Sequence, residues 1–273
     1  MNILGVKVDN LTKKEILEKI RTFLIEPKFH QIATINPEFI LEAQKNPEFK
    51  NIINNCDLNV ADGFGIKLAF WRFGKKLKAR FTGADLMLEI LKIASKQNFT
   101  VFLAVNKDGL STFEETKSAI LKIYPDLIIE GIDLEKNVSC FMFHVSCSIL
   151  FCNFGAPQQE LFINSQKCDT PPHLSHNNSK NISNKNLNGD FEQSSDLQND
   201  RCGGKIRLAM GVGGCFDFLT GKVRRAPKIL RLIGLEWLWR IFQPQEWKFK
   251  KERLKRIFLA VIIFPIRVTI NKK

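Results

Sequence analysis

The sequence predicts an α/β fold: a Rossmann-like, mostly parallel sheet flanked by helices, followed by a basic helical C-terminal appendage. Helix-like and strand-like segments alternate over the first three-fifths of the 273-residue chain, as expected for repeated βα units. The hydrophobic content of 44% is enough to bury one large core or two modest ones. After Gly221 the composition changes to Arg and Lys mixed with large apolar residues, which indicates a separate helical segment.

Helices are predicted where a capping residue precedes apolar residues at helical spacing. Thr12 and Glu15 have the spacing of a capping box ahead of the first such run. Asn36-Pro37 and Asn46-Pro47 each join a cap to a proline suited to the first helical turn. Further helices are predicted after Asp62-Gly63 and over residues 84–94 and 111–123, with Ser111 and Glu114 at the start of the last.

Short apolar runs between these helices predict the strands. They cover residues 31–35, 58–60, 100–105, 127–129, 149–153 and 206–210. Because helix candidates separate most of them, the strands are expected to run parallel in a doubly wound sheet.

Composition divides the chain into an α/β domain over residues 1–220 and an appendage over 221–273. Within the first domain, residues 165–204 are rich in Asn, Ser and Asp, which predicts a disordered surface insertion. Its histidines and cysteines have the spacing of no common zinc module, so we predict no metal there. These residues are Cys168, His173, His176 and Cys202.

The net charge of +13 is concentrated at the C-terminus. Residues 222–273 contain fifteen Lys and Arg against three Glu, a balance of +12, so the rest of the chain is nearly neutral. A basic tail indicates an anionic partner, either a phospholipid surface or nucleic acid. A charged helix that is merely solvated is the simpler alternative.

Cysteine usage and the termini predict a cytosolic protein. The seven cysteines form an odd number without a CxxC motif, and four lie in apolar stretches (Cys140, Cys147, Cys152 and Cys215), which favours reduced thiols. The N-terminus lacks a signal-peptide pattern. The longest apolar run, residues 257–264, is shorter than the roughly 20 residues needed to cross a bilayer.

Polar residues and glycines follow the predicted strands, and in an open parallel sheet these strand ends form the ligand site. They are Thr34, Asn36, Asp62, Gln159, Glu160, Gly213 and Asp217. Each has a simpler interpretation, because Asp62-Gly63 is also a common turn and Thr34 or Asn36 is also a helix cap.

Several familiar ligand motifs are missing from the sequence. Phe216 stands where a dinucleotide-binding GxGxxG motif would need glycine, which disfavours a nucleotide-cofactor oxidoreductase. There is also no GxxxxGK[ST] loop, no HExxH and no Asp-x-Asp pair after a strand. A bound nucleotide diphosphate would therefore depend on positive side chains and backbone N–H groups rather than on a metal.

Taken together, the motifs resemble the WecG/TagA/CpsF family of bacterial glycosyltransferases. The matching stretches occur in family order and cover nearly the whole chain except the insertion. They are TINPEFILEA (34–43), ADGFGI (61–66), RFTGADL (80–86), YPDL (124–127), FGAPQQE (154–160), GVGGCFDFLTGKVRRAP (211–227) and GLEWLWRIFQP (234–244).

The resemblance implies inverting transfer of N-acetylmannosamine, or a related hexose, from a UDP-sugar. In view of the missing metal-binding motifs, we expect no cofactor and no metal requirement. The implied acceptor is N-acetylglucosamine on a polyprenyl diphosphate, used in cell-surface polysaccharide or teichoic acid-type synthesis. In this family pattern Asp62 corresponds to the general base, and Thr34, Arg80 and Gln159 to polar pocket positions. Arg224, Arg225 and Arg231 fall where the family is thought to meet the lipid diphosphate.

The tail also predicts peripheral attachment to the cytoplasmic face of the membrane. Aromatic residues alternate with basic ones there, a pattern typical of helices in the headgroup layer. The residues are Trp237, Trp239, Phe242, Trp247, Phe249, Lys248, Lys250, Lys251, Arg253, Lys255 and Arg256. The alternative is that the aromatic residues pack on the α/β domain. We expect an anionic membrane surface as partner, a possible homo-oligomer and no nucleic acid; a non-catalytic basic binding protein remains the alternative.

Overall fold

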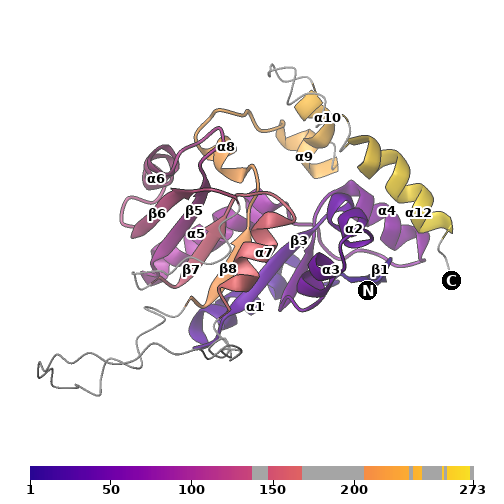
Figure 1. Cartoon of the computed structure of the whole chain (residues 1–273), viewed down its shortest axis with the longest axis horizontal. Helices are drawn as coiled ribbons and strands as arrows, with labels where there is room; N and C mark the ends of the chain where they lie inside the picture. Colours follow the sequence, from indigo (N-terminus) through magenta and orange to yellow (C-terminus); the bar gives the residue numbers. More distant parts are fainter. Residues whose placement is uncertain (137–146, 168–205, 234–235, 242–253, 255–256, 271–273) are drawn as a thin grey trace, which may run out of the picture.

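The computed structural model describes residues 1–136, 147–167, 206–233, 236–241, 254 and 257–270 (Figure 1). The strands are β1 (Asn2–Ile3), β2 (Val6–Lys7), β3 (His30–Ile35), β4 (Leu58–Ala61), β5 (Val101–Asn106), β6 (Ile129–Leu134), β7 (Ile149–Cys152) and β8 (Leu208–Gly211). The helices of the α/β domain are α1 (Lys13–Ile25), α2 (Pro37–Ala43), α3 (Pro47–Asn54), α4 (Phe64–Arg72), α5 (Gly83–Gln97), α6 (Phe113–Leu121), α7 (Gln158–Ser165) and α8 (Cys215–Leu219). The tail contributes α9 (Lys228–Ile233), α10 (Glu236–Ile241), the π-helical η1 (Leu259–Ile263) and α12 (Phe264–Ile270).

The predicted α/β fold is confirmed. Six strands form one parallel sheet in the order β4-β3-β8-β7-β5-β6, while β1 and β2 pair in a small antiparallel hairpin. β3 lies between β4 and β8, with Thr34 opposite Val60 and Ile32 opposite Met210. This order brings the carboxyl ends of β4, β3, β8 and β7 next to one another, and these four ends carry the predicted site residues.

Helices cover both faces of the sheet, so the central strands are buried on both sides. In β5, Val101 and Leu103 belong to a core shared with α1 and α5, while Phe102 and Ala104 belong to a core shared with α7. The alternation follows from the two-residue period of a strand. A further core, which includes Ala33, lies under α2, α3 and α4.

Most predicted elements differ from the structure by a few residues at their ends, and two differences bear on the site or the sheet. The helix predicted over 111–123 spans Phe113–Leu121, and its capping box is formed by Thr112 and Glu115 rather than Ser111 and Glu114. Ser111 is buried instead, and its hydroxyl binds Asp217. A strand was predicted over 127–129, but β6 spans Ile129–Leu134. Only Ile129 is common to both, because the residues that pair with β5 begin there.

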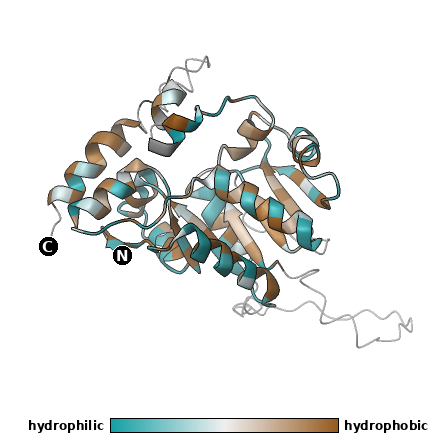
Figure 2. Ribbon diagram, turned by 180° about the vertical axis from the view of Figure 1, so that it is seen from behind, coloured by the Kyte–Doolittle hydropathy of each residue, from teal (hydrophilic) through white to brown (hydrophobic). Residues whose placement is uncertain are grey.

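The C-terminal helical segment, residues 257–270 with η1 and α12, packs on the α/β domain. Phe264 and Val268 are 1% and 2% exposed and join the core beneath α4. The opposite side of this segment is open: Phe258 is 51% exposed and Ile270 is 74% exposed. Figure 2 shows this segment largely in brown, because most of its residues are apolar.

Several predictions lie outside the described residues. They include nearly all of the predicted insertion, with its four Cys and His residues, and the six basic residues predicted to meet a membrane. The start of the predicted insertion overlaps the end of α7, because Ser165 is still helical and Gln166 is buried. The side chain of Trp237 is also outside the described part.

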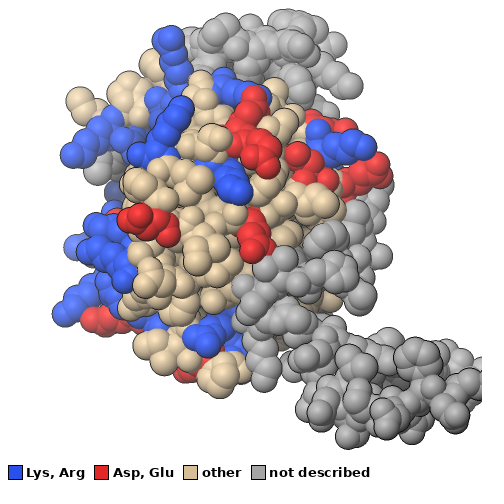
Figure 3. Space-filling view, turned by 90° about the vertical axis from the view of Figure 1, so that its left-hand side faces the viewer, with Lys and Arg blue, Asp and Glu red and all other residues tan. Residues whose placement is uncertain are grey.

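Four cysteines among the described residues are free and buried: Cys56, Cys147, Cys152 and Cys215. Burial raises the pKa of the Cys147 thiol to about 12, in keeping with a small hydrophobic residue. Within the described part of the chain, none of the helices combines the length and apolar character needed to cross a membrane. Figure 3 shows Lys and Arg interspersed with Asp and Glu on the face at the β6 edge, as expected for a nearly neutral domain.

Candidate active site

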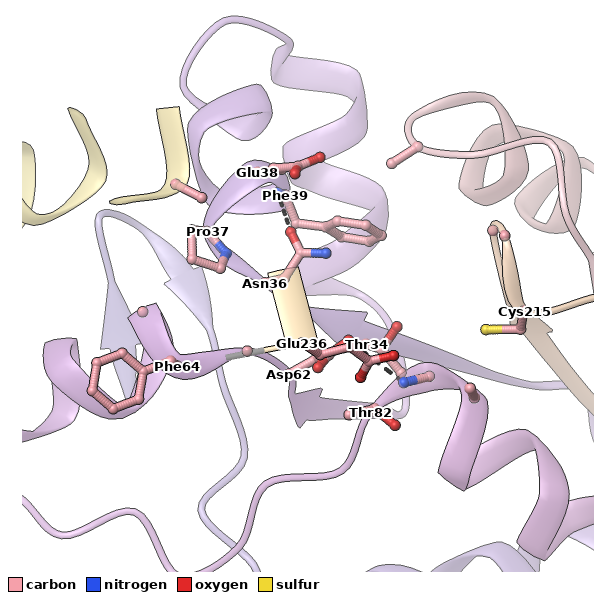
Figure 4. Close-up of a pocket in the computed structure, with 18 of the residues that line it drawn as sticks. Thr34, Asn36, Pro37, Glu38, Phe39, Asp62, Phe64, Thr82, Cys215 and Glu236 are labelled. Atoms are coloured by element: carbon pink, nitrogen blue, oxygen red, sulfur yellow. Dashed lines mark hydrogen bonds between the residues drawn. The ribbon is translucent and has the colours of Figure 1, made fainter. Parts of the chain in front are cut away.

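A pocket of about 420 Å³ opens at the carboxyl edge of the sheet (Figure 4). Its walls come from the segments after β3, β4, β7 and β8, from the start of α5 and from the tail. Six of the predicted site residues line it: Thr34, Asn36, Asp62, Arg80, Gln159 and Gly213. The structure therefore brings together residues that are up to 179 positions apart in the sequence.

Asp62 follows β4 and faces the beginning of α5. Its backbone N–H donates a hydrogen bond to the carbonyl oxygen of Ile35 at 2.8 Å, which continues the β3–β4 register past the strands. The N–H of Gly83, the first residue of α5, lies 3.5 Å from Asp62 Oδ2. Because the N-terminus of a 15-residue helix carries partial positive charge, it stabilises a carboxylate at this point.

Asn36 has both of the roles considered from the sequence. Its side-chain oxygen accepts a hydrogen bond from the N–H of Phe39 at 3.0 Å and so caps α2, and the residue also lines the pocket.

Two glycines shape the chain next to Asp62. A Cβ atom at Gly65 would collide with the ring of Pro37, so glycine permits α4 to approach α2 closely. The turn at Gly63 has φ +84°, which glycine adopts without strain.

Gln159 connects the two loops that follow β7 and β8. Its side-chain oxygen accepts hydrogen bonds from the N–H of Gly155 at 3.1 Å and from the N–H of Gly213 at 3.0 Å. Both glycines have positive φ angles, +77° and +49°. Gln159 is only 3% exposed and lines the pocket, and its two hydrogen bonds also fix the position of the two loops relative to each other.

Glu160 and Asp217, both predicted to bind substrate, are absent from the pocket lining. Glu160 is 2% exposed, and its Oε1 accepts a hydrogen bond from Gln159 Nε2 at 2.7 Å. Burial raises the pKa of Glu160 to about 8. Asp217 accepts a hydrogen bond from the Ser111 hydroxyl at 2.8 Å, which links α8 to the start of α6. Both side chains therefore lie outside the pocket and form hydrogen bonds with residues of the surrounding elements.

Two of the three tail arginines converge on Asp85, in the first turn of α5. Arg225 Nη2 lies 2.9 Å and Arg231 Nη1 3.5 Å from Asp85 Oδ1. Burial raises the pKa of Asp85, but a hydrogen bond from Thr82 and the charge of Arg225 outweigh it, so the net pKa lies below its usual value. Arg80, which lines the pocket, donates a hydrogen bond to the carbonyl oxygen of Arg231.

Arg224 is exposed, unlike its neighbour Arg225, which is partly buried. Since Arg80 is both a pocket residue and a partner of Arg231, the two converging tail arginines lie beside the pocket rim. The three arginines predicted to act together thus occupy different environments.

Several lining residues were not predicted from the sequence. Thr82 caps α5, and Glu38 follows Pro37 in the first turn of α2. Others come from the tail: Glu236, Ile257, Ala260, Val261 and Pro265. The motifs RFTGADL and GLEWLWR contain Thr82 and Glu236, but a motif alone does not indicate that a tail residue reaches the pocket.

Among the described residues there is no group of three or more His, Cys, Asp and Glu side chains arranged to hold a metal ion. The prediction of metal-free chemistry is not tested by this finding and stays a prediction.

A parallel α/β sheet with a carboxylate and arginines at its carboxyl edge is typical of enzymes that transfer groups from anionic substrates. The family model described as "Glycosyl transferase WecG/TagA/CpsF family" matches residues 1–177 and 196–273. The chain belongs to this family of glycosyltransferases. The unmatched residues, 178–195, fall within the predicted insertion.

Curated relatives agree with this assignment. The chain is similar to N-acetylglucosaminyldiphosphoundecaprenol N-acetyl-beta-D-mannosaminyltransferases of Staphylococcus aureus strains MRSA252 and MW2. Each is 30% identical over 270 residues, which cover 94% of this chain and 89% of the relative. The resemblance found in the sequence is confirmed, and an enzyme is favoured over the non-catalytic alternative.

Proposed function

We propose that this enzyme transfers N-acetylmannosamine from a UDP-sugar to N-acetylglucosamine linked through a diphosphate to a polyprenyl lipid, with inversion at the anomeric carbon. The acceptor and the sugar are those in the names of the Staphylococcus aureus relatives. The observation that carries the proposal is a carboxylate, Asp62, in the same pocket as Arg80 at the carboxyl edge of the sheet.

Asp62 is suited to act as the general base. Inversion in a single displacement needs one group that removes the proton from the acceptor hydroxyl as its oxygen attacks. The start of α5 stabilises the carboxylate form that this role requires. The attacking oxygen forms a bond to the anomeric carbon while the bond from that carbon to the UDP oxygen breaks. The bonding electrons leave with UDP, and the proton remains on Asp62.

Charge that develops on the departing diphosphate needs positive partners. Arg80 lines the pocket, and its planar fork can donate two hydrogen bonds to phosphate oxygens. Arg225 and Arg231 beside it are suited to the second diphosphate, on the lipid acceptor. Under this proposal the positive charge comes from arginine, and no metal is needed.

A lipid-linked acceptor requires the enzyme to work at a membrane surface. The outward side of the C-terminal helical segment exposes Phe258, Ile262 and Ile266 by 45–51%. Apolar side chains on one side of a helix, next to a strongly basic stretch of sequence, favour binding in the headgroup layer of an anionic membrane. We therefore propose a peripheral enzyme at the cytoplasmic face of the membrane.

The proposal is tested by incubating the full chain with UDP-N-acetylmannosamine and a short-chain lipid diphosphate bearing N-acetylglucosamine, and by measuring released UDP. Parallel reactions contain UDP-N-acetylglucosamine, UDP-glucose or the uronic acid form of the donor, and each is repeated with EDTA. We expect acceptor-dependent UDP release, highest with UDP-N-acetylmannosamine and insensitive to EDTA. NMR of the product should give an anomeric configuration opposite to that of the donor. Acceptor-independent release alone, or retained configuration, contradicts the proposal.

A further inference from the structure

The α/β domain carries a basic surface of its own, on α4 and the loop that follows it. Residues 63–84 contain six Lys and Arg but no Asp or Glu, although the domain as a whole is nearly neutral. The same stretch holds Trp71, which is 77% exposed. A cluster of cations and an exposed aromatic ring therefore occur together on this part of the domain.

One side of α4 is buried and the other is open to solvent. Ile66 and Phe70 belong to the core beneath the helix. On the open side, Lys67 precedes Trp71 by four residues and Leu68 precedes it by three. Residues at these spacings are neighbours on a helix surface. The indole ring therefore has a cation and an apolar side chain as its helical neighbours.

The cations of this surface have no acidic partner in the described part of the chain. There, the side chains of Lys67, Arg72, Lys75 and Lys76 form no ion pair with Asp or Glu. The three lysines are exposed. Like charges that gather without acids repel one another and attract an anionic partner from outside the chain. We call Lys67, Trp71, Lys75 and Lys76 the α4 surface.

Hydrogen bonds hold the loop after α4 in a defined conformation. The N–H of Lys75 donates to the carbonyl oxygen of Phe70 at 2.9 Å, which folds the loop back on the end of the helix. The side chain of Asn10 donates to the carbonyl oxygen of Lys76 at 3.0 Å and accepts from the N–H of Lys78 at 2.8 Å. The loop lysines are therefore fixed at the C-terminal end of α4.

The α4 surface adjoins both the pocket and the tail. Leu68 lines the pocket, so Trp71 is one helical turn away from a residue of the pocket wall. α12 contacts α4 and lies beside it in Figure 1. Ile266 of α12, which is proposed above to meet the membrane, is 50% exposed. The α4 surface therefore continues a region that already has an expected membrane contact.

An anionic membrane fits this surface better than the other anionic or apolar partners. A second copy that bound through the same surface would bring like charges together, which is unfavourable. A nucleic acid would satisfy the charge, but the neighbouring apolar residues, Leu68 and Ile266, are aliphatic and suit acyl chains rather than stacked bases. Tryptophan and lysine side chains together are typical of the headgroup layer.

We propose that the α4 surface is a second membrane-binding site, which acts together with the tail. Trp71 enters the headgroup layer, and the three lysines bind anionic lipid headgroups. The inference rests on the proposed function in taking the partner to be the membrane that holds the lipid acceptor. Two linked contacts bind a surface more tightly than either alone. They also hold the pocket next to the bilayer, because Leu68 belongs to its wall.

The test titrates the full chain with phosphatidylcholine vesicles that contain or lack phosphatidylglycerol. The surface variant combines Lys67→Gln, Lys75→Gln and Lys76→Gln. The matched control removes the same charge from exposed positions of α1 and α5, which pack on a different core, and combines Lys19→Gln, Lys92→Gln and Lys96→Gln. Each lysine near an anionic membrane changes binding by about fivefold. We expect the surface variant to bind anionic vesicles about tenfold to a hundredfold more weakly, and the control to bind like wild type.

A second measurement follows Trp71 itself. The difference in fluorescence between wild type and Trp71→Phe isolates the emission of this one indole. With anionic vesicles that emission should shift to shorter wavelength and be quenched by brominated lipid, which a purely structural role would not produce. The surface variant should release UDP at the wild-type rate with a short-chain acceptor in solution, and more slowly with an acceptor embedded in vesicles.

Three results overturn the inference. They are wild-type vesicle binding by the surface variant, an equal loss in the control, and Trp71 emission that vesicles do not change. Binding of the wild-type chain to RNA, or its self-association in light scattering, also overturns it if the surface variant loses that property and keeps vesicle binding. If the wild-type chain releases no UDP while the surface variant loses vesicle binding, the proposed function fails and the membrane-binding surface stands.

Discussion

The guanidinium of Arg225 lies 2.9 Å from the carboxylate of Asp85, which joins the tail to the first turn of α5. Arg231 approaches the same oxygen at 3.5 Å, so one carboxylate orients two arginines. The start of α5 also contacts Asp62 through the N–H of Gly83. A single helix terminus thus fixes both the proposed base and the arginines expected to bind the acceptor diphosphate.

Asp85→Asn should weaken acceptor binding more than it weakens the fold. The carboxylate is partly exposed, so its ion pairs add only about 1 kcal/mol or less to the free energy of unfolding. Without it Arg225 and Arg231 lose their common partner, and we expect the acceptor KM to rise by about tenfold. Steady-state kinetics measures the change in acceptor KM, and thermal unfolding measures the change in stability. A stability loss of several kcal/mol with an unchanged KM would mean that Asp85 is structural only.

Gln159→Ala should impair the pocket and the fold together. Removal of the side chain leaves the N–H groups of Gly155 and Gly213 without their acceptor, which costs about 1–3 kcal/mol for each group that stays buried. We expect a lower midpoint of thermal unfolding and at least a tenfold loss of UDP release. Gln159→Glu is a second variant for comparison. It keeps an oxygen that can accept hydrogen bonds from both glycines, but it places a second carboxyl group next to that of Glu160. Wild-type stability in Gln159→Ala would contradict this account of the loops.

The buried carboxyl of Glu160 should make stability depend on pH. Its pKa is about 8 in the folded protein, above the ordinary value of 4.5, so between these values the folded state binds the extra proton. The free energy of unfolding should therefore decrease as pH rises from about 5 to 8, by at most about 1.4 kcal/mol per pH unit. Glu160→Gln should flatten this dependence in urea unfolding curves. Equal slopes for both proteins would show that Glu160 is not the titrating group.

Two phenylalanines of the C-terminal segment should separate docking from membrane binding. Phe264 is 1% exposed against α4, so Phe264→Ala should lower stability or release the tail, with a loss of about 3–5 kcal/mol in packing. Phe258 is 51% exposed, so Phe258→Ala should leave thermal unfolding unchanged and weaken binding to vesicles containing anionic lipid. Protease susceptibility and vesicle sedimentation measure the two effects. The reverse pattern would contradict the orientation of this segment.

Much of the site could be predicted because strand ends in a parallel sheet meet at one edge. Asp62 follows β4 and Thr34 lies next to the last residue of β3, so their proximity follows from topology alone. The choice between neighbours such as Gln159 and Glu160 could not be made in this way. It depends on the rotation of α7 against β8, which brings Gln159 to the glycine loops and buries Glu160.

The tail was predictable in composition but not in its contacts. The alternation of aromatic and basic residues in the tail indicates a helix at a membrane surface. The pattern does not distinguish residues that face outward from residues that pack on the α/β domain. Phe258 and Phe264 lie six positions apart in one apolar run, yet only Phe264 meets α4. The burial of Glu236 is likewise a tertiary effect, since nothing local in GLEWLWR distinguishes a pocket residue from an exposed acid.

The central claim is that Asp62 removes the proton from the acceptor hydroxyl. The most direct test is the rate of acceptor-dependent UDP release by Asp62→Asn, with Asp126→Asn, an exposed aspartate outside the pocket lining, as the matched control. We predict that Asp62→Asn loses about 10²–10⁴-fold in kcat while it folds and binds donor normally, and that Asp126→Asn keeps wild-type activity. Asp62→Asn that releases UDP at the wild-type rate would contradict the account.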